Sequence, residues 1–202
     1  MYEKLSLQKK VDKKQITAYL RQGKIGLFPT DTVYGVCCRV DDSGAVERIF
    51  QIKRREKEKP VLILSDTFER AKKYIKNYNI DFQKKQIIEK YWPGPLTIVF
   101  PANLKKVPSI VRAGGDTIAI RIPDKDDLRE VIEELGVPIV APSANLSGGK
   151  TFSSLARIDE KILSGVDFIV DGECTIKSAS TIIDFSKDKI EILRHGALDL
   201  SL

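Results

Sequence analysis

Short apolar runs and longer amphipathic segments alternate along this chain, and the alternation predicts an α/β protein. Apolar runs bounded by turn residues predict strands. Apolar positions repeating every three or four residues predict helices. The predicted strands are 25–28, 33–40, 61–64, 96–100, 117–122, 139–141, 167–170, 181–185 and 189–193. The predicted helices are 12–22, 44–53, 66–76, 82–91, 127–135 and a segment from Ser153 or Ser154 to Leu163.

The helix over 127–135 has the clearest pattern, because its apolar residues fall on one face and Gly136 follows. Asp12 and Ser43 are suited to cap the first and second helices. The run 61–64 is apolar throughout, as strands covered on both faces of a parallel sheet are. Ser186-Lys187-Asp188 joins the last two strands, which predicts a hairpin.

These elements predict an open, mixed α/β sheet with flanking helices, formed by one domain over residues 1–202. The chain has 202 residues, 42% of them hydrophobic, which suffices for a substantial core. There is no apolar leader and no run of membrane-spanning length, so we expect a soluble, cytoplasmic protein. The three cysteines have no metal-ligand spacing and are expected to be buried thiols.

The net charge of +6, with an isoelectric point near 9.1, favours an anionic partner. A nucleotide and a nucleic acid both meet that description. A lysine-rich, solvated surface is the simpler alternative, and charge alone does not decide between them.

Polar residues gather where predicted strands end. The stretch from Lys24 to Val36 is a short apolar run followed by Pro29 and a loop rich in hydrogen-bonding side chains. Three later segments, 117–123, 139–149 and 189–196, have the same form. Loops at one edge of an α/β sheet converge, so we expect these segments to share a pocket. The converging side chains would be Thr30, Thr32, Tyr34, Thr117, Arg121, Ser143, Asn145 and Arg194, with Lys53, Arg55 and Lys59 beside them.

This set holds hydroxyls, an amide and cations but few carboxylates, which fits phosphoryl or nucleotidyl transfer by positioning and charge neutralisation. His195 is the only histidine, so no Ser-His-Asp set exists, and we expect it to lie on the surface without a role. Each feature also has a simpler interpretation. The cations at 53–55 would be a solvated helix end, Arg121 an exposed or salt-bridged residue, and Ser143 and Asn145 turn caps.

Seven motifs in order make the chain recognisable. They are P-T-D-T-V-Y-G (29–35), K-x-R (53–55), W-P-G-P-L-T (92–97), T-I-A-I-R-I-P (117–123), A-P-S-A-N-L-S-G (141–148), S-T-I-I-D (180–184) and I-L-R-x-G (192–196). Together they resemble the YrdC/Sua5 family of threonylcarbamoyl-AMP synthases, over roughly residues 10–199. We expect the short YrdC-like branch, because Lys59 and Leu64 resemble that branch and the chain ends soon after the last motif.

The resemblance implies a twisted, open, mixed sheet with a deep basic cavity. It also implies a nucleotidyltransferase that makes threonylcarbamoyl-AMP and pyrophosphate from L-threonine, bicarbonate and ATP. That product serves the modification of adenosine 37 in tRNAs reading codons that begin with A. Expected partners are therefore those substrates and tRNA or the later threonylcarbamoyl-transfer proteins, with no membrane. Mg²⁺ is expected to arrive with ATP rather than in a protein-bound site.

Matched position by position, the resemblance implies two groups of site residues, with Lys53 and Arg55 in the catalytic role. The ATP-binding group is Lys53, Arg55, Lys59, Thr117, Ser143, Asn145, Thr151 and Arg194. The group for threonine and bicarbonate is Thr30, Thr32, Tyr34, Arg121, Ala141 and Ser180. We expect Asp31, whose carboxylate suits an anion site poorly, to point away or bond its own loop backbone.

Three positions depart from the family pattern. Glu56 stands where proline is usual, Lys59 where longer members have asparagine, and Leu64 where they have histidine. Three alternatives stay open: a protein that binds tRNA or double-stranded RNA through its basic surface, a YciO-type paralogue without this activity, and a hydrogenase-maturation carbamoyltransferase. The last normally carries zinc-finger and acylphosphatase segments, for which 202 residues leave no room.

Overall fold

A ten-stranded mixed sheet organises the computed structural model, which describes residues 3–76 and 80–200. The strand order is β1-β8-β2-β3-β7-β4-β6-β5-β9-β10. The strands are β1 Glu3–Ser6, β2 Gly26–Pro29, β3 Tyr34–Arg39, β4 Ile63–Leu64, β5 Leu96–Pro101, β6 Thr117–Arg121, β7 Ile139–Val140, β8 Phe168–Asp171, β9 Thr181–Asp184 and β10 Glu191–Arg194.

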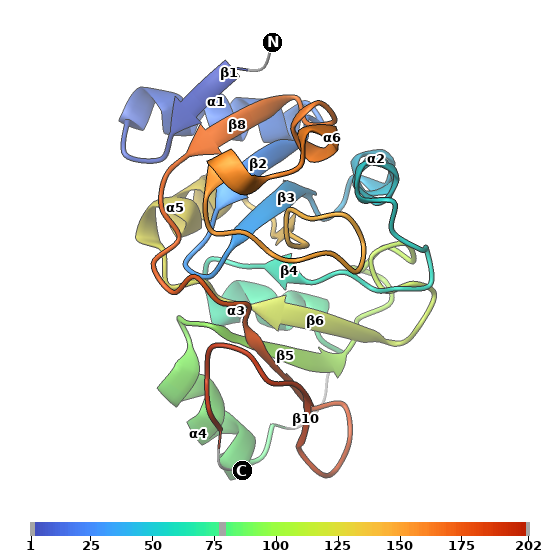
Figure 1. Ribbon diagram of the computed structural model, residues 1–202. Helices are drawn as coiled ribbons and strands as arrows, with labels where there is room; N and C mark the ends of the chain where they lie inside the picture. The colour runs from blue at the N-terminus through green and yellow to red at the C-terminus, as the bar shows by residue number, and fades with distance from the viewer. Residues whose placement is uncertain (1–2, 77–79, 201–202) are drawn as a thin grey trace.

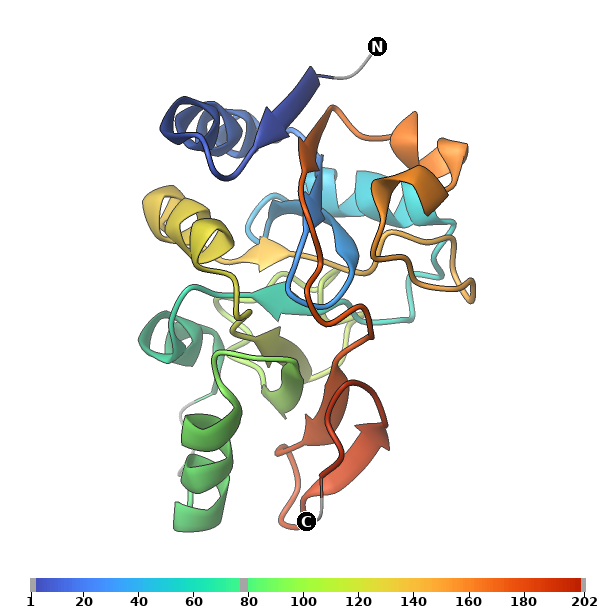
Figure 2. The ribbon, with the colours of Figure 1, turned by 60° about the vertical axis from the view of Figure 1, so that its left-hand side comes forward.

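Helices cover both faces of this sheet. They are α1 Lys10–Arg21, α2 Ser43–Lys53, α3 Phe68–Ala71, α4 Phe82–Tyr91, α5 Asp126–Leu135 and α6 Glu160–Leu163. Figure 2 shows α1, α5, α3 and α4 along one side, with α2 and α6 on the other. In the part of the chain that the structure describes, no helix is both long and apolar enough to cross a membrane.

The two faces of the sheet have separate cores, and side-chain alternation along the strands divides the residues between them. Cys38 packs in the larger cluster with Leu27 and Ile63, whereas its neighbour Cys37 packs in the smaller one with Phe28. Successive side chains of a strand point to opposite faces, so an unbroken apolar run marks a strand buried on both. The prediction of a sheet covered on both faces is confirmed.

Most predicted elements are present, with shifted ends. The final hairpin is confirmed, because β9 and β10 pair antiparallel. The sequence reading missed β1, which pairs in parallel with β8 at one edge of the sheet. The helix predicted over 66–76 is α3 followed by a 3₁₀ turn, Lys72–Tyr74. The helix predicted to end at Leu163 is likewise divided, into a 3₁₀ turn at Leu155–Arg157 and α6.

Both predicted helix caps are wrong by a few residues. Asp12 lies inside α1, and its carboxylate accepts a hydrogen bond from the Ser6 amide at 2.8 Å. Ser43 is the first residue of α2, and Asp42 caps that helix by accepting from the Ala45 amide at 2.9 Å. Asp42 and Ser43 are neighbours of similar capping ability, which sequence alone cannot rank, whereas α1 begins after Lys9 with no side-chain cap.

Candidate active site

A small cavity of about 50 Å³ lies where the sequence predicted a shared pocket. Nine of the fourteen predicted site residues line it: Thr30, Thr32, Tyr34, Arg121, Ala141, Ser143, Thr151, Ser180 and Arg194. Four further residues complete the lining: Val33, Gly35, Leu62 and Ala179. Among these described residues there are two arginines and no acidic side chain. The cavity is therefore polar, and its ionic groups are cationic.

The segments meet for a different reason from the one predicted. By strand pairing, β6 and β10 run opposite to β2 and β7, so in a flat sheet their carboxyl ends would lie at opposite edges. The turn between β2 and β3 instead reaches down the sheet towards β4 (Figure 1), and its residues contact the end of β6. The turn, rather than a common edge, brings the predicted residues together.

Arg121, which lines the cavity, forms a buried ion pair with Asp31, which does not line it. Nη1 of Arg121 donates to Oδ1 of Asp31, and both side chains are almost fully buried. As expected, Asp31 does not line the cavity, but its carboxylate pairs with a buried guanidinium and with the Asp124 amide rather than with the backbone of its own loop. Nη2 of Arg121 lies 3.3 Å from the Thr30 hydroxyl. Within the described residues, Nε of Arg121 is buried without a hydrogen-bond partner.

Thr30 fixes the shape of the turn that carries Thr32. Its Oγ1 donates to the Val33 carbonyl at 2.7 Å and accepts from the amides of Thr32 and Val33. The hydroxyls of Thr30 and Thr32 are 2.9 Å apart. A threonine bonded in this way locks its own turn, so Thr32 is presented to the cavity by a rigid loop.

Ser180 and Arg194 form another part of the cavity lining. The Ser180 hydroxyl is 2.7 Å from the hydroxyl of Thr97, and Nη2 of Arg194 donates to it at 3.1 Å. Nε and Nη2 of Arg194 also donate to the Ser180 carbonyl, at 3.1 and 2.8 Å. Burial, and secondarily the charge of Arg121, lower the pKa of Arg194. Sequence reasoning missed Thr97, although it lies in the W-P-G-P-L-T motif.

Lys53, the last residue of α2, is tied to the loop after β7. Its ammonium donates to the Ser143 carbonyl and, at 2.5 Å, to the Asn145 carbonyl. The Lys53 side chain is buried, and burial together with the charge of Arg55 lowers its pKa to about 7. Asn145 does not line the cavity; its amide donates to the carbonyls of Leu146 and Gly149. Its Oδ1 accepts from the Ser143 hydroxyl at 2.5 Å.

Five predicted residues do not line the small cavity: Lys53 and Asn145, described above, and Arg55, Lys59 and Thr117. Arg55 donates to the carbonyls of Lys59 and Pro60, at 3.1 and 2.8 Å. Lys59 is exposed and pairs with Glu56 at 3.0 Å. Thr117 begins β6 and Arg121 ends it, which separates them by about 13 Å at the usual rise of a strand. The structure therefore does not bring Arg55, Lys59 and Thr117 to the cavity wall that holds Arg121.

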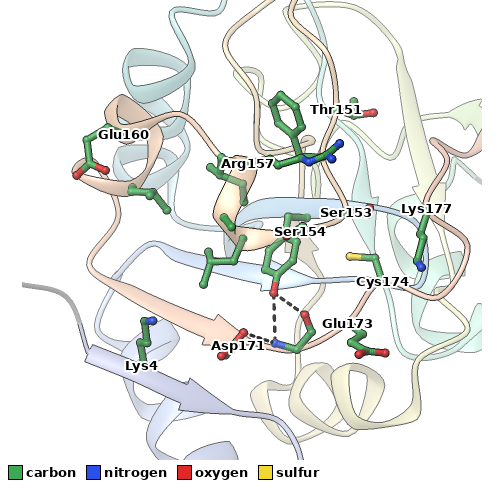
Figure 3. Close-up of a pocket in the computed structure, with 17 residues that line it drawn as sticks. Lys4, Thr151, Ser153, Ser154, Arg157, Glu160, Asp171, Glu173, Cys174 and Lys177 are labelled. Atoms are coloured by element: carbon green, nitrogen blue, oxygen red, sulfur yellow. Dashed lines mark hydrogen bonds between the residues drawn. The ribbon is translucent and has the colours of Figure 1, made fainter.

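A larger cavity of about 1050 Å³ adjoins the small one and shares Tyr34 and Thr151 with it. Figure 3 shows side chains of both charges around it, among them Lys4, Arg157 and Glu173. Tyr34 is fully buried, and its hydroxyl donates to the Gly172 carbonyl at 2.6 Å and accepts from the Gly172 amide at 3.2 Å. Burial raises the pKa of Tyr34 to about 12. Its ring thus contributes to the cavity walls while its hydroxyl holds the segment after β8.

The cysteines are buried, as predicted. Burial raises the pKa of all three thiols, to about 11 for Cys174 and well beyond the ordinary range for Cys37 and Cys38. His195 is exposed. Across residues 3–76 and 80–200, no group of three or more histidine, cysteine or acidic side chains is arranged to hold a metal ion.

Comparison with known proteins identifies relatives over almost the whole chain. The family model described as "Telomere recombination" (Sua5/YciO/YrdC) matches residues 18–196. A Pyrococcus abyssi protein named threonylcarbamoyl-AMP synthase is 37% identical over 183 residues, which are 90% of this chain and 53% of that protein. A Methanocaldococcus jannaschii protein named putative threonylcarbamoyl-AMP synthase is 37% identical over 195 residues, covering 94% and 89%. The chain thus spans about half of the first relative and most of the second.

Solved structures show the same fold. The crystal structure of P. abyssi Sua5 complexed with L-threonine superimposes with a TM-score of 0.88 at 33% identity, covering 97% of this chain and 57% of that one. The crystal structure of E. coli YciO superimposes with a TM-score of 0.84 at 23% identity, covering 98% and 96%. At that lower identity the second likeness bears on the fold alone.

Proposed function

Because this chain belongs to the Sua5/YciO/YrdC family, we propose that it is an L-threonylcarbamoyladenylate synthase. The reaction would join L-threonine, bicarbonate and ATP into threonylcarbamoyl-AMP and release pyrophosphate. The observation that carries the proposal is Arg121, a buried guanidinium with an unpartnered Nε on a cavity lined by hydroxyls. A buried donor without a partner costs free energy, about 1–3 kcal/mol, which a ligand oxygen would recover.

The threonine end of the substrate would bind at the small cavity. The α-carboxylate would take two parallel hydrogen bonds from Arg121, and the hydroxyls of Thr32 and Ser180 would meet the polar groups of the amino acid. Thr30, Tyr34 and Ala141 would shape the walls. An amino acid without matching polar groups would leave these hydroxyls unpaired, which is a strong basis for rejection. The relative solved with bound L-threonine supports this substrate class.

The nucleotide end would extend over the loop after β7. Ser143, Thr151 and Arg194 line the small cavity, and Thr151 also borders the larger one. We propose that the two cavities together form the deep site which the family resemblance implies, with the purely cationic lining confined to the small cavity. Lys53 retains one ammonium proton beyond those given to Ser143 and Asn145. That proton and the guanidinium of Arg55 would meet phosphate oxygens, with Lys59, Thr117 and Asn145 completing the ATP contacts.

The reaction needs no nucleophile from the protein. The threonine amine and bicarbonate would form an N-carboxylate with loss of water. An oxygen of that carbamate would attack the α-phosphorus of ATP, and the bond to the pyrophosphate leaving group would break. Positioning and charge neutralisation by Lys53 and Arg55 are the contributions expected of the chain. Mg²⁺ would accompany the triphosphate as part of the substrate. The product would pass to tRNA or to the proteins that transfer the threonylcarbamoyl group.

A pyrophosphate-release assay tests this function. The purified chain is given ATP and Mg²⁺ with L-threonine and bicarbonate, and each of these two is omitted in turn. Release that requires both, with threonylcarbamoyl-AMP identified by mass spectrometry, supports the synthase. Release that ignores threonine, or tRNA binding without any turnover, would favour an RNA-binding protein or a YciO-type paralogue.

A further inference from the structure

The buried carboxylate of Asp31 has no role in the reaction as proposed so far, yet it touches the residue on which the proposal depends. Both of its oxygens are used. Oδ1 accepts from Nη1 of Arg121, and Oδ2 accepts from the Asp124 amide at 3.2 Å. The Asp31 side chain has no exposed surface. Asp31 thus joins the turn after β2 to the residues that leave β6.

The contacts of Arg121 show which edge of its guanidinium is free. A guanidinium can give two parallel N–H bonds from its end, through Nη1 and Nη2, or from its side, through Nη2 and Nε. Asp31 holds Nη1, so the end is engaged. Among the described residues Nε is unpartnered, and the contact from Nη2 to the Thr30 hydroxyl is long, at 3.3 Å. The side edge is the one left for a ligand.

The net charge of the groups at the cavity also suits a ligand with one carboxylate. Arg121 and Arg194 both line the cavity, and Asp31 neutralises one of the two. Arg121, Asp31 and Arg194 together carry one net positive charge, which one substrate carboxylate would balance. A buried ion pair is weak support for stability, because well-packed apolar residues of similar size often stabilise a fold equally well. Stability alone therefore does not account for a charged pair at this position.

We propose that Asp31 is the positioning residue of Arg121: it holds Nη1 so that the Nε side edge faces the α-carboxylate of a small amino acid. The inference rests on the proposed function, since it assigns the recognition step of the same site. Asp31 touches no substrate in this scheme. It acts through Arg121, and its loss would allow the guanidinium to turn towards other acceptors.

The test compares Asp31→Asn with the wild type in the pyrophosphate assay, using L-threonine and L-threonine amide, which lacks the carboxylate. We expect the KM for L-threonine to rise ten- to a hundredfold while the KM for ATP changes less than twofold. The preference for L-threonine over the amide should fall by the same factor. In an Arg121→Gln background, Asp31→Asn should change the KM for L-threonine less than twofold, because the arginine through which Asp31 acts is already absent.

The matched control is Asp66→Asn. Asp66 is also largely buried and pairs with Arg70 at 2.6 Å, outside the cavity, so its loss should leave both KM values within twofold. If Asp31→Asn does not fold, Asp31→Ser keeps an acceptor for the Asp124 amide and should show the same loss of selectivity. A folded Asp31 variant with unchanged KM for threonine, or with both KM values raised equally, overturns the inference. A wild type without threonine-dependent turnover overturns the proposed function instead.

Discussion

The ammonium of Lys53 and the main-chain carbonyl of Asn145 lie 2.5 Å apart, which links the end of α2 to the loop that follows β7. A second bond joins the same ammonium to the Ser143 carbonyl, and the Ser147 amide donates to the Lys53 carbonyl at 2.9 Å. The K-x-R and S-x-N motifs are therefore one structural unit. A cation at the end of a helix holds the loop that carries the proposed nucleotide contacts.

Lys53→Met should lower kcat/KM for ATP by about ten- to a hundredfold, because a charge-assisted hydrogen bond contributes about 1.5–3 kcal/mol. The same change should increase amide hydrogen exchange in the loop 143–149, which loses two of its anchors. Steady-state kinetics and hydrogen-exchange mass spectrometry measure the two effects. Lys57→Met, which removes a solvent-exposed lysine paired with Glu47, is the control and should change neither. Full activity in folded Lys53→Met would remove Lys53 from the ATP site.

ATP binding should take up a proton above pH 7. The pKa of Lys53 is lowered from 10.5 to about 7 by burial and by Arg55, so at pH 8 the free protein holds Lys53 mostly neutral. A bound polyanion favours the charged form and raises that pKa. Calorimetry of ATP binding at pH 8 measures the number of protons taken up, from the dependence of the observed binding enthalpy on the ionisation enthalpy of the buffer. In Lys53→Arg the cation stays charged, and the uptake should disappear; identical uptake in both proteins would assign it to another group.

Tyr34→Phe should destabilise the fold more than it impairs substrate binding. The hydroxyl bonds both the carbonyl and the amide of Gly172, so its removal should cost about 1 kcal/mol. Because Gly172 is exposed, its carbonyl and amide can bond to water in the variant, which keeps the loss of stability small. Urea unfolding measures the change in free energy, and the KM for threonine should shift less than threefold. A large KM effect with unchanged stability would place the hydroxyl in substrate contact.

Gly196→Ala should disturb the wall formed by Ser180. A Cβ at position 196 would lie 2.4 Å from the Ala179 carbonyl oxygen and 2.5 Å from the carbonyl carbon and oxygen of Ser180. Those are backbone atoms, so the segment around Ser180 must move. We expect weaker threonine binding together with a loss of stability of about 1–3 kcal/mol. Gly136→Ala is an instructive contrast, because its Cβ meets nothing within 4 Å and only its φ of +82° opposes the change. That variant should lose stability without losing affinity for threonine.

Most helices and strands could be predicted from the sequence, because caps, turn residues and apolar periodicity act between residues close together in the chain. The helix α4 is observed at the bounds predicted for it, 82–91, since Asp81 caps it and the Pro93-Gly94-Pro95 segment follows it. The strand β1 was missed because four residues with two exposed side chains carry little pattern, and β1 exists through its pairing with β8. The residues of one strand do not by themselves reveal which distant strand it pairs with.

The sequence predicted which residues belong to the site, but it did not predict how they contact one another. The prediction named nine of the residues that line the small cavity, including Thr32 and Arg121, and eight of the nine lie in the quoted motifs. The sequence did not reveal the partner of Asp31, because the cation that neutralises this carboxylate, Arg121, lies 90 positions away. Thr117 was grouped with Arg121 because they share a strand, and the length of that strand separates them.

The segment that closes the cavity joins opposite halves of the sheet. β8 is second in the strand order and β9 is ninth, and the residues between them cross the turn after β2, with the Ile176 amide donating to the Asp31 carbonyl at 2.8 Å. During synthesis, the turn that carries Thr32 emerges from the ribosome roughly 150 residues before Ser180 does. The nascent chain can form α1 and the β2–β3 hairpin early, but the cavity closes only when β9 has docked. The protein should therefore acquire ligand affinity late and in a single step, and its folding should be slow, as expected for a topology governed by contacts between distant residues.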